Sequence, residues 1–307
     1  MASSSIKLLN TMEWARRFIG QRQTALGNYN EPALTSANTI LETIVGAPFA
    51  WPWNRAVIGF ICVPGQQDYT IFNWIAGANV SVGTVLVDSN GNSQIVTVAG
   101  VTGSTIPTWN PTAGLPTVDN TVTWTNSGPI GLSNGSTNYS LGWIESASVK
   151  VSNPNSGGTV WKEIEQKVCL GVDSVASRPH DISAQFIDVN GNITFRLMPA
   201  PDKAYPVSIT LQQRPTLLIG VNSTWAPIPD SYSHIYNWGF LSLMYMFCDD
   251  QRAQFANQKF VAHLLSTNQG LTDLERNIWL NNWQSVSGVQ LLLPNNVQQG
   301  SQAKGAV

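Results

Sequence analysis

Two Asn-Gly pairs constrain the fold of the middle of this chain more than any other feature. Asn90-Gly91 lies between the runs VGTVLVD and SQIVTV, and Asn190-Gly191 lies between SAQFID and NITFRLM. An Asn-Gly pair between alternating runs predicts a hairpin, because a type I′ turn needs a positive φ at both central residues. Strands and helices do not alternate around these hairpins, so we expect an antiparallel sheet and no parallel one.

The N-terminal part of the chain has helical spacing instead. Asn10 or Thr11 is expected to cap a first helix, which Gly27 ends. A second helix is expected from Asn30, its cap, to Gly46, which is followed by a proline that cannot continue it.

Helical spacing returns after residue 226. The run from Ser231 to Cys248 is apolar nearly all round, which is typical of a helix buried on most sides, in a core or between subunits. Thr272 and Glu275 form a capping box that opens a final helix. The tail from about Pro294 is polar and is expected to be mobile unless a partner orders it.

These patterns predict an α+β fold, in which a helical bundle from both chain ends packs with an antiparallel β-domain that carries a small inserted all-β module. We expect such an insertion to hold its own core, so that its deletion leaves the remainder folded. The expected parts are N-terminal helices at 1–50, a β-domain at 51–76 and 130–226, the inserted module at 77–129, C-terminal helices at 227–290 and a polar tail at 291–307.

Charge is scarce in this sequence. Charged residues make up 11% of the 307 residues, against roughly 25% in an ordinary soluble protein. The formal net charge is −2, and the basic stripe of a monomeric nucleic-acid binder is missing. A neutral surface of this kind fits a protein that packs against copies of itself or other subunits.

The start of the chain lacks an apolar stretch that would serve as a signal peptide, and no segment approaches the roughly 18 apolar residues of a membrane span. We therefore expect folding in a cytoplasm and no membrane partner. Cys62, Cys169 and Cys248 lie far apart in apolar runs, which predicts buried, reduced thiols.

The sequence shows no catalytic constellation. The histidines and cysteines lack the spacing of a zinc site, and no nucleophile elbow or phosphate-binding loop is present. Asp249-Asp250 suggests paired carboxylates, but a solvated break between helices or a contact to a neighbouring Arg explains it better. We therefore expect no enzyme, no cofactor and no metal, because function must be argued from a site.

Several aromatic and basic residues are candidates for contacts with partners. Arg16 and Arg17, on the first helix, either touch DNA or an acidic partner, or form a solvated face in which Glu13 pairs with Arg17. Trp109 and Trp124 are the tryptophans that suggest a stacking platform, whereas most others have core spacing. The assembly-interface candidates are Trp14, Arg16, Arg17, Trp238, Phe240, Met244 and Phe247.

Residues 77–129 carry a spaced set of glycines, aspartates and tryptophans. The set consists of Gly83, Asp88, Gly91, Gln94, Gly100, Gly103, Pro107, Trp109, Gly114, Asp119, Thr123, Trp124 and Gly128. With this spacing the segment resembles a small β-module found repeatedly in structural and tail proteins of bacteriophages. The resemblance points to a virion protein without saying which one.

The rest of the chain resembles phage head-to-tail adaptor proteins. The likeness rests on APFAWPWNR at 47–55, on the sheet segment at 181–215 with its PAPDKAY, and on the helix pair that begins at IPDSYSHIYNWGF. The resemblance implies that twelve copies form a ring, with the portal protein and a downstream tail protein as partners. It also implies a place in the neck of the virion and a lumen for double-stranded DNA without sequence-specific binding.

Two other functions remain open from the sequence. The first is another tail component, such as a tube, baseplate or completion protein. The second is a host-attachment or carbohydrate-binding protein, with Trp109 or Trp124 of the β-module as a stacking platform. A receptor binder is mostly β-structure, whereas this chain begins and ends in helices, which favours the adaptor.

Overall fold

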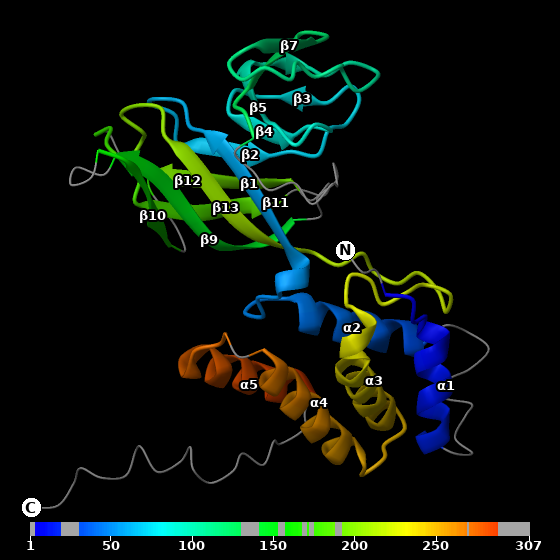
Figure 1. Cartoon of the computed structure of the whole chain (residues 1–307). Helices are drawn as coiled ribbons and strands as arrows, with labels where there is room; N and C mark the ends of the chain where they lie inside the picture. Colours follow the sequence, from blue (N-terminus) through cyan, green and yellow to red (C-terminus); the bar gives the residue numbers. More distant parts are fainter. Residues whose placement is uncertain are drawn as a thin grey trace, which may run out of the picture. The chain divides into compact units, whose positions relative to one another are not determined.

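The computed structural model describes residues 4–19, 31–129, 141–152, 157–167, 171, 175–187, 192–268 and 270–287. The chain divides into two compact units (Figure 1). A β-unit runs from Ala50 to Pro215, and a helical unit combines Ala2–Phe49 with Thr216–Val307. The fold is therefore of the mixed α and β kind that the sequence predicts.

Within the described part of the β-unit, eleven strands form one sheet in the order β1-β13-β9-β10-β11-β12-β2-β4-β5-β8-β7, and β3 and β6 form a separate pair. The strands are β1 (Arg55–Ile61), β2 (Asp68–Ile71), β3 (Asn79–Val80), β4 (Thr84–Val87), β5 (Ser93–Val98), β6 (Gly100–Val101), β7 (Pro116–Asp119), β8 (Val122–Asn126), β9 (Leu141–Ser152), β10 (Thr159–Gln166), β11 (Asp181–Ile187), β12 (Ile193–Met198) and β13 (Pro206–Gln213).

The sheet is mixed, so the expectation of a wholly antiparallel sheet was wrong. β2 pairs in parallel with β4, where Thr70 lies opposite Thr84. β10 pairs in parallel with β11, where Glu165 lies opposite Asp181. Hairpin signals report only on strands that follow each other through a tight turn. Each parallel pair joins strands separated by a longer connection, which leaves no local signal.

The hairpin predicted at Asn90-Gly91 is present, but its turn is not type I′. Gly91 has a φ of 79°, and Asn90 is not among the residues with positive φ. The Gly91 N–H donates to the Asp88 carbonyl at 3.0 Å, and the Asp88 N–H donates to the Asn92 carbonyl at 2.9 Å. This is the three-residue loop that ends in a left-handed glycine. β11 and β12 also pair as predicted, while Asn190-Gly191 lies outside the described residues.

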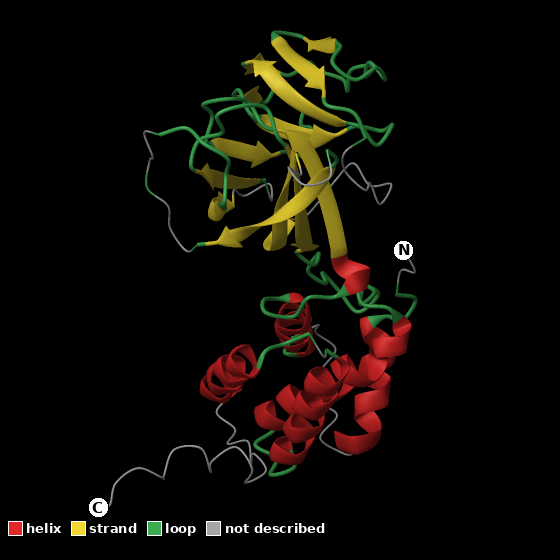
Figure 2. Cartoon of the chain, turned by 60° about the vertical axis from the view of Figure 1, so that its left-hand side comes forward, coloured by secondary structure: helices red, strands yellow, loops and turns green. Residues whose placement is uncertain are grey.

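One apolar cluster fills the concave side of the sheet, which curls around it (Figure 2). Alternate residues of β12 and β13 point into it, as the period of two predicts. All of these inward side chains are fully buried, namely Ile193, Phe195, Leu197, Val207, Ile209 and Leu211.

The strands β4 and β5 lie between two cores. Val85, Val87 and Ile95 belong to the cluster inside the curled sheet, whereas Leu86 and Val96 belong to a second cluster. The second cluster consists of Phe72, Val80, Leu86, Val96, Trp109, Val122 and Trp124. Residues 77–129 therefore share their strands with the main core. They also have a largely separate core, because every member of the second cluster except Phe72 lies within 77–129. That they form an inserted module stays a prediction.

The helical unit contains α1 (Leu8–Ile19), α2 (Ala33–Val45), α3 (Ser233–Phe247), α4 (Ala253–Thr267) and α5 (Asp273–Ser287). Short 3₁₀ turns precede β1 at Pro52–Asn54 and α3 at Asp230–Tyr232. The predicted end of α2 at Gly46 is confirmed. The capping box before α5 is also confirmed, because the Thr272 N–H donates to Glu275 at 2.9 Å and the Glu275 N–H donates to Thr272 Oγ1 at 3.3 Å.

The first helix begins at Leu8, so the predicted caps Asn10 and Thr11 were wrong. The N–H groups of Leu8 and Leu9 donate to the carbonyls of Ser223 and Val221, both at 2.9 Å. A distant loop therefore supplies the partners that a local cap provides elsewhere. Asn10 instead accepts the Lys7 N–H from inside the first turn. The proposed end at Gly27 and the cap at Asn30 lie outside the described residues.

Candidate functional site

The described part of the chain holds no group of three His, Cys, Asp or Glu side chains that could bind a metal ion. The rings of His234 and His263 pack at 5.1 Å, on α3 and α4. Burial lowers the pKa of His263, and the nearby His234 and Lys259 lower it further. Such a pair packs two helices together and provides neither a nucleophile nor a ligand set.

The Asp249-Asp250 pair marks the break between α3 and α4. Asp249 has a positive φ of 51°. Asp250 accepts the backbone N–H of Arg252 at 2.9 Å and pairs with its guanidinium at 2.7 Å. The same guanidinium donates to the Phe18 carbonyl at the end of α1 at 3.0 Å. The expected contact to a neighbouring Arg is therefore present, and the pair joins three helices.

Asp119 ties together the segment at 77–129. Its buried carboxylate accepts the indole N–H of Trp74 at 2.9 Å and that of Trp124 at 3.3 Å. It also accepts the backbone N–H of Gly103 at 2.7 Å. A buried carboxylate with three donors is a structural clamp, because a buried polar group needs hydrogen-bond partners.

Asp88 does the same for the β4–β5 hairpin. It accepts the backbone N–H groups of Asn90 at 2.8 Å and Asn92 at 2.9 Å, and the side-chain amide of Gln94 at 2.8 Å. The carboxylate thus holds the loop in its turn. Asp88, Asn92 and Gln94 are all buried, so this part of the motif faces inward.

The motif glycines are also structural. A Cβ at Gly83 would lie 1.5 Å from Nε2 of Gln66, and a Cβ at Gly100 would lie 2.5 Å from Oγ1 of Thr121. Gly83, Gly91, Gly114 and Gly128 have positive φ angles, which favour glycine over every other residue. The motif therefore specifies a backbone, and its spacing does not mark a binding surface.

Trp109 and Trp124 cannot serve as stacking platforms in this structure. Trp124 is fully buried and Trp109 is 6% exposed. Their rings pack edge to face at 5.8 Å inside the second core. Neither ring face is open to a sugar or a base, so the carbohydrate-binding reading loses the residues on which it depended.

The helical unit presents aromatic side chains at its surface. Trp14 and Phe18 of α1 pack at 4.7 Å, and both contact Trp238 of α3, at 5.6 and 6.1 Å. Trp238 also contacts Phe255 of α4 at 6.0 Å. Phe18 is 39% exposed and Phe255 is 56% exposed, while both tryptophans are half-buried. We call these four residues the aromatic surface.

The remaining interface candidates divide into buried and exposed residues. Phe240 and Met244 are fully buried in the helical unit, so they do not face a partner and that expectation was wrong. Phe247 is 61% exposed. Arg16 is half-buried and Arg17 is exposed. Among the described ion pairs, none joins Arg17 to Glu13.

Sequence reasoning identified Trp14 and Trp238 but missed the two phenylalanines. Phe18 follows Trp14 by four residues, which places both on one side of α1. Phe255 stands in the first turn of α4, four residues before Lys259, whose ammonium lies 5.5 Å from its ring. Both phenylalanines have polar neighbours in the sequence, and this could have identified them as surface residues.

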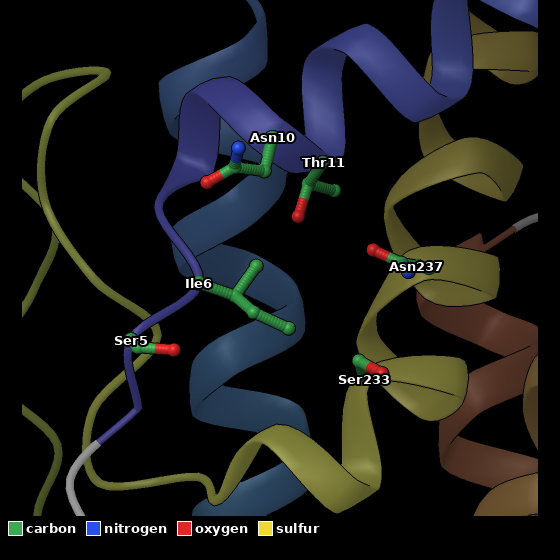
Figure 3. A pocket seen from close by; sticks show the side chains of 6 residues that line it. All are labelled: Ser5, Ile6, Asn10, Thr11, Ser233 and Asn237. Atoms are coloured by element: carbon green, nitrogen blue, oxygen red, sulfur yellow. The ribbon is translucent and has the colours of Figure 1, made fainter.

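A hollow of about 410 Å³ lies in the seam between α1 and α3, and its lining residues Asn10 and Asn237 stand on the same helices as Trp14 and Trp238. Its walls come from residues 5–6 before α1, the first turn of α1 and the first two turns of α3 (Figure 3). The buried Oδ1 of Asn237, on α3, accepts no hydrogen bond from the described residues. The lining residues are Ser5, Ile6, Asn10, Thr11, Ser233 and Asn237.

The chain before α1 is held beside this hollow by Asp230. The carboxylate accepts the Ser4 hydroxyl at 2.8 Å and the backbone N–H of Ser5 at 3.0 Å. Hydrogen bonds from Ser5 and Ser4 keep the pKa of Asp230 below its usual value. Asp230 therefore stays charged and holds the segment at 4–6 in place.

No helix in the described ranges has the length and apolar character needed to cross a membrane.

The cysteines differ in burial. Cys62 is buried, and burial raises the pKa of its thiol to about 11. Cys248 is half-buried, so the expectation of a buried thiol does not hold there. Cys169 lies outside the described residues.

Comparison with known proteins identifies the family. No curated protein matches the chain. The model of one family, the SU10 adaptor protein, matches residues 15–287, from the second half of α1 to the end of α5. The match includes the β-unit and nearly all of the described helical unit, and it covers well over half of the 307 residues. The chain therefore belongs to the SU10 adaptor protein family, whose members are structural adaptors of phages and components of the virion.

Proposed function

We propose that this protein is a head-to-tail adaptor, which forms a ring between the portal protein and the next tail component. The observation that carries the proposal is the family match over residues 15–287. We also propose that the ring has twelve copies and that double-stranded DNA passes through its lumen.

The surface of the chain supports an assembly role. Half-exposed aromatic rings on α1, α3 and α4 are costly to leave in water and gain by packing against another subunit. Charged residues are only 11% of the sequence, and the net charge is −2. DNA passes easily through a ring that does not grip phosphate, which fits a protein without an excess of basic residues.

We propose that the region at 77–129, as an addition to the adaptor frame, contacts the tail component. The exposed apolar side chains there include Ile106, Leu115 and Val118. These three lie in the long β6–β7 connection and in β7 itself. Because Trp109 and Trp124 are buried, a protein partner fits this region better than a sugar does.

The decisive experiment mixes the purified protein with portal rings of the same virus and images the product by negative stain. We expect an added annular density on one face of the portal ring. Binding to a tail-tube or baseplate protein, with no density on portal rings, would replace the adaptor by another tail component. Glycan binding in place of both would favour host attachment.

A further inference from the structure

We propose that α5 of a second copy packs along the α1–α3 seam, antiparallel to α1, and that this contact joins neighbouring subunits. The inference rests on the proposed ring and names the two surfaces that form it. One surface is the aromatic surface with the adjoining polar hollow. The other is the outward side of α5.

The seam has two chemically distinct ends. Asn10, Trp14 and Phe18 recur at four-residue spacing, which places them on one side of α1. At the Phe18 end the surface is aromatic, because Trp14 and Phe18 meet Trp238 there. At the Asn10 end the surface is amide and hydroxyl, and the side-chain oxygen of Asn237 there has no hydrogen-bond partner among the described residues.

The outward side of α5 also has an apolar end and a polar end. Trp279 and Trp283 point inward and pack on Phe49 and Phe260. On the opposite side, Leu274 is 69% exposed and Ile278 is 51% exposed. The same side continues through exposed polar residues, namely Asn281, Asn282 and Ser285.

The spacing of the two patterns agrees. Phe18 and Asn10 are eight residues apart on α1, and Leu274 and Asn282 are eight residues apart on α5. At a rise of 1.5 Å per residue, both separations are about 12 Å. Placing Leu274 beside Phe18 therefore brings Asn282 beside Asn10 and Asn237. The apolar ends match only if α5 runs antiparallel to α1.

Charge favours the same direction. The basic residues of α1, Arg16 and Arg17, lie in its last turn. The acidic residues of α5, Asp273 and Glu275, lie in its first turn. The antiparallel register brings these turns together, where opposite charges attract and the helix dipoles are also opposed. The parallel register would separate these charges and set aromatic rings against asparagines.

The two surfaces belong to different helices. When two subunits make one contact, the pair therefore still has one aromatic surface and one α5 available for further contacts. Within the helical unit, α1 and α5 lie at opposite sides (Figure 1). A contact between different surfaces repeats from subunit to subunit and closes into a ring when the rotation allows it. A second copy is therefore the occupant that the geometry favours.

The test is disulfide trapping at exposed positions. The variant carries Arg17→Cys and Asp273→Cys, with Cys169 and Cys248 changed to serine, and is oxidised both alone at high concentration and on portal rings. We expect a ladder of covalent multimers on a non-reducing gel. A mixture of the two single-cysteine variants should stop at the dimer, because each subunit then has one reactive end.

The matched control replaces the second site with Ser285→Cys, at the other end of α5. It should give several-fold less crosslinked product than the Asp273→Cys pair. A stronger ladder from Ser285→Cys, dimers from Arg17→Cys alone, or no ladder in protein bound to portal rings would each overturn the inference and leave the adaptor function standing. Failure to bind portal rings would instead count against the proposed function, whichever crosslinks form.

Discussion

The region at 77–129 and the helical unit use their distinctive residues in opposite ways. The region at 77–129 has a recognisable motif, and its aspartates, tryptophans and glycines point inward or set the backbone. The helical unit has no such motif, yet it presents aromatic rings at its surface. Strict spacing reports on residues that a backbone needs, because turns and buried networks tolerate few alternatives. A contact surface needs only a suitable chemistry, so its residues leave a weaker pattern.

The largest effect is expected from deletion of residues 77–129, which tests whether this region can be separated from the rest of the β-unit. Its deletion removes β4 and β5, and with them Val85, Val87 and Ile95 from the main core. We expect the shortened chain to lose its cooperative fold and its solubility. Soluble yield and far-ultraviolet circular dichroism measure this, with Ile106→Ser, at a 59% exposed position, as the control that should fold. A soluble, cooperatively unfolding deletion variant would show that the region is separable after all.

The next effect concerns the buried clamp of Asp119. Asp119→Ala leaves the donors of Trp74, Trp124 and Gly103 without their acceptor. The loss of these three hydrogen bonds, of which the one from Trp124 is fully buried, should cost about 3 kcal/mol together. Urea unfolding should show that loss, while Val118→Ala, at an exposed neighbour, should stay within about 0.5 kcal/mol. Equal stability of the two variants would remove the clamp from the explanation of the motif.

Alanine substitution at two glycines with similar φ angles distinguishes a steric clash from backbone strain. Gly65 and Gly83 have φ angles of 78° and 85°. A Cβ at Gly65 meets nothing within 4 Å, whereas at Gly83 it displaces the Gln66 amide, which donates to Asp68 at 2.8 Å and to Val82 at 3.0 Å. Gly65→Ala should cost about 1 kcal/mol. Gly83→Ala should cost about 1 kcal/mol more. Equal unfolding midpoints would show that the motif glycine is needed for φ alone.

The aromatic surface should contribute little to the stability of a single chain. Phe255 is 56% exposed, so Phe255→Ala should lower the free energy of unfolding by less than about 1 kcal/mol. Phe260→Ala, at a fully buried ring on the same helix, should cost about 3–5 kcal/mol. Thermal unfolding of the two variants provides the comparison. A large loss from Phe255→Ala would make the aromatic surface part of the core and weaken its role in assembly.

The smallest effect is the pH dependence that His263 contributes to the helical unit. Burial lowers its pKa in the folded state, so the unfolded chain binds the proton more readily. The stability from neutral His263 is complete above its ordinary pKa of about 6.5 and is lost as the pH falls through the lower, folded value. His263→Gln should reduce the fall in melting temperature between neutral and mildly acidic pH. An unchanged fall would assign the acid sensitivity to other groups.

The parts of the fold that could be predicted have local causes. The β4–β5 and β11–β12 pairings and the capping box at Thr272 are each specified within a few residues. The start of α1 could not be predicted, because its first N–H groups bind carbonyls more than two hundred positions away along the chain. The parallel pairing of β2 with β4 is likewise set by the tertiary fold.

The candidate site shows the same division. A helix that is apolar all round, such as α3, is predicted to be buried, but its sequence does not say which side the other helices cover. Buried Phe240 and Met244 therefore could not be distinguished from the partly exposed Trp238. The pairing of Trp14 with Trp238 also depends on how α1 and α3 pack, which the spacing along either helix does not specify.

The long-range cap of α1 has a consequence for the order in which the protein matures. A ribosome releases the N-terminus first, yet α1 obtains its terminal hydrogen-bond partners from Val221 and Ser223, and Thr11 accepts the indole N–H of Trp225. The β-unit, synthesised in between, can fold while α1 still waits. A chain that ends before α3 and α4 therefore cannot display the surface shared by α1, α3 and α4. The aromatic surface is complete only after synthesis has passed Phe255.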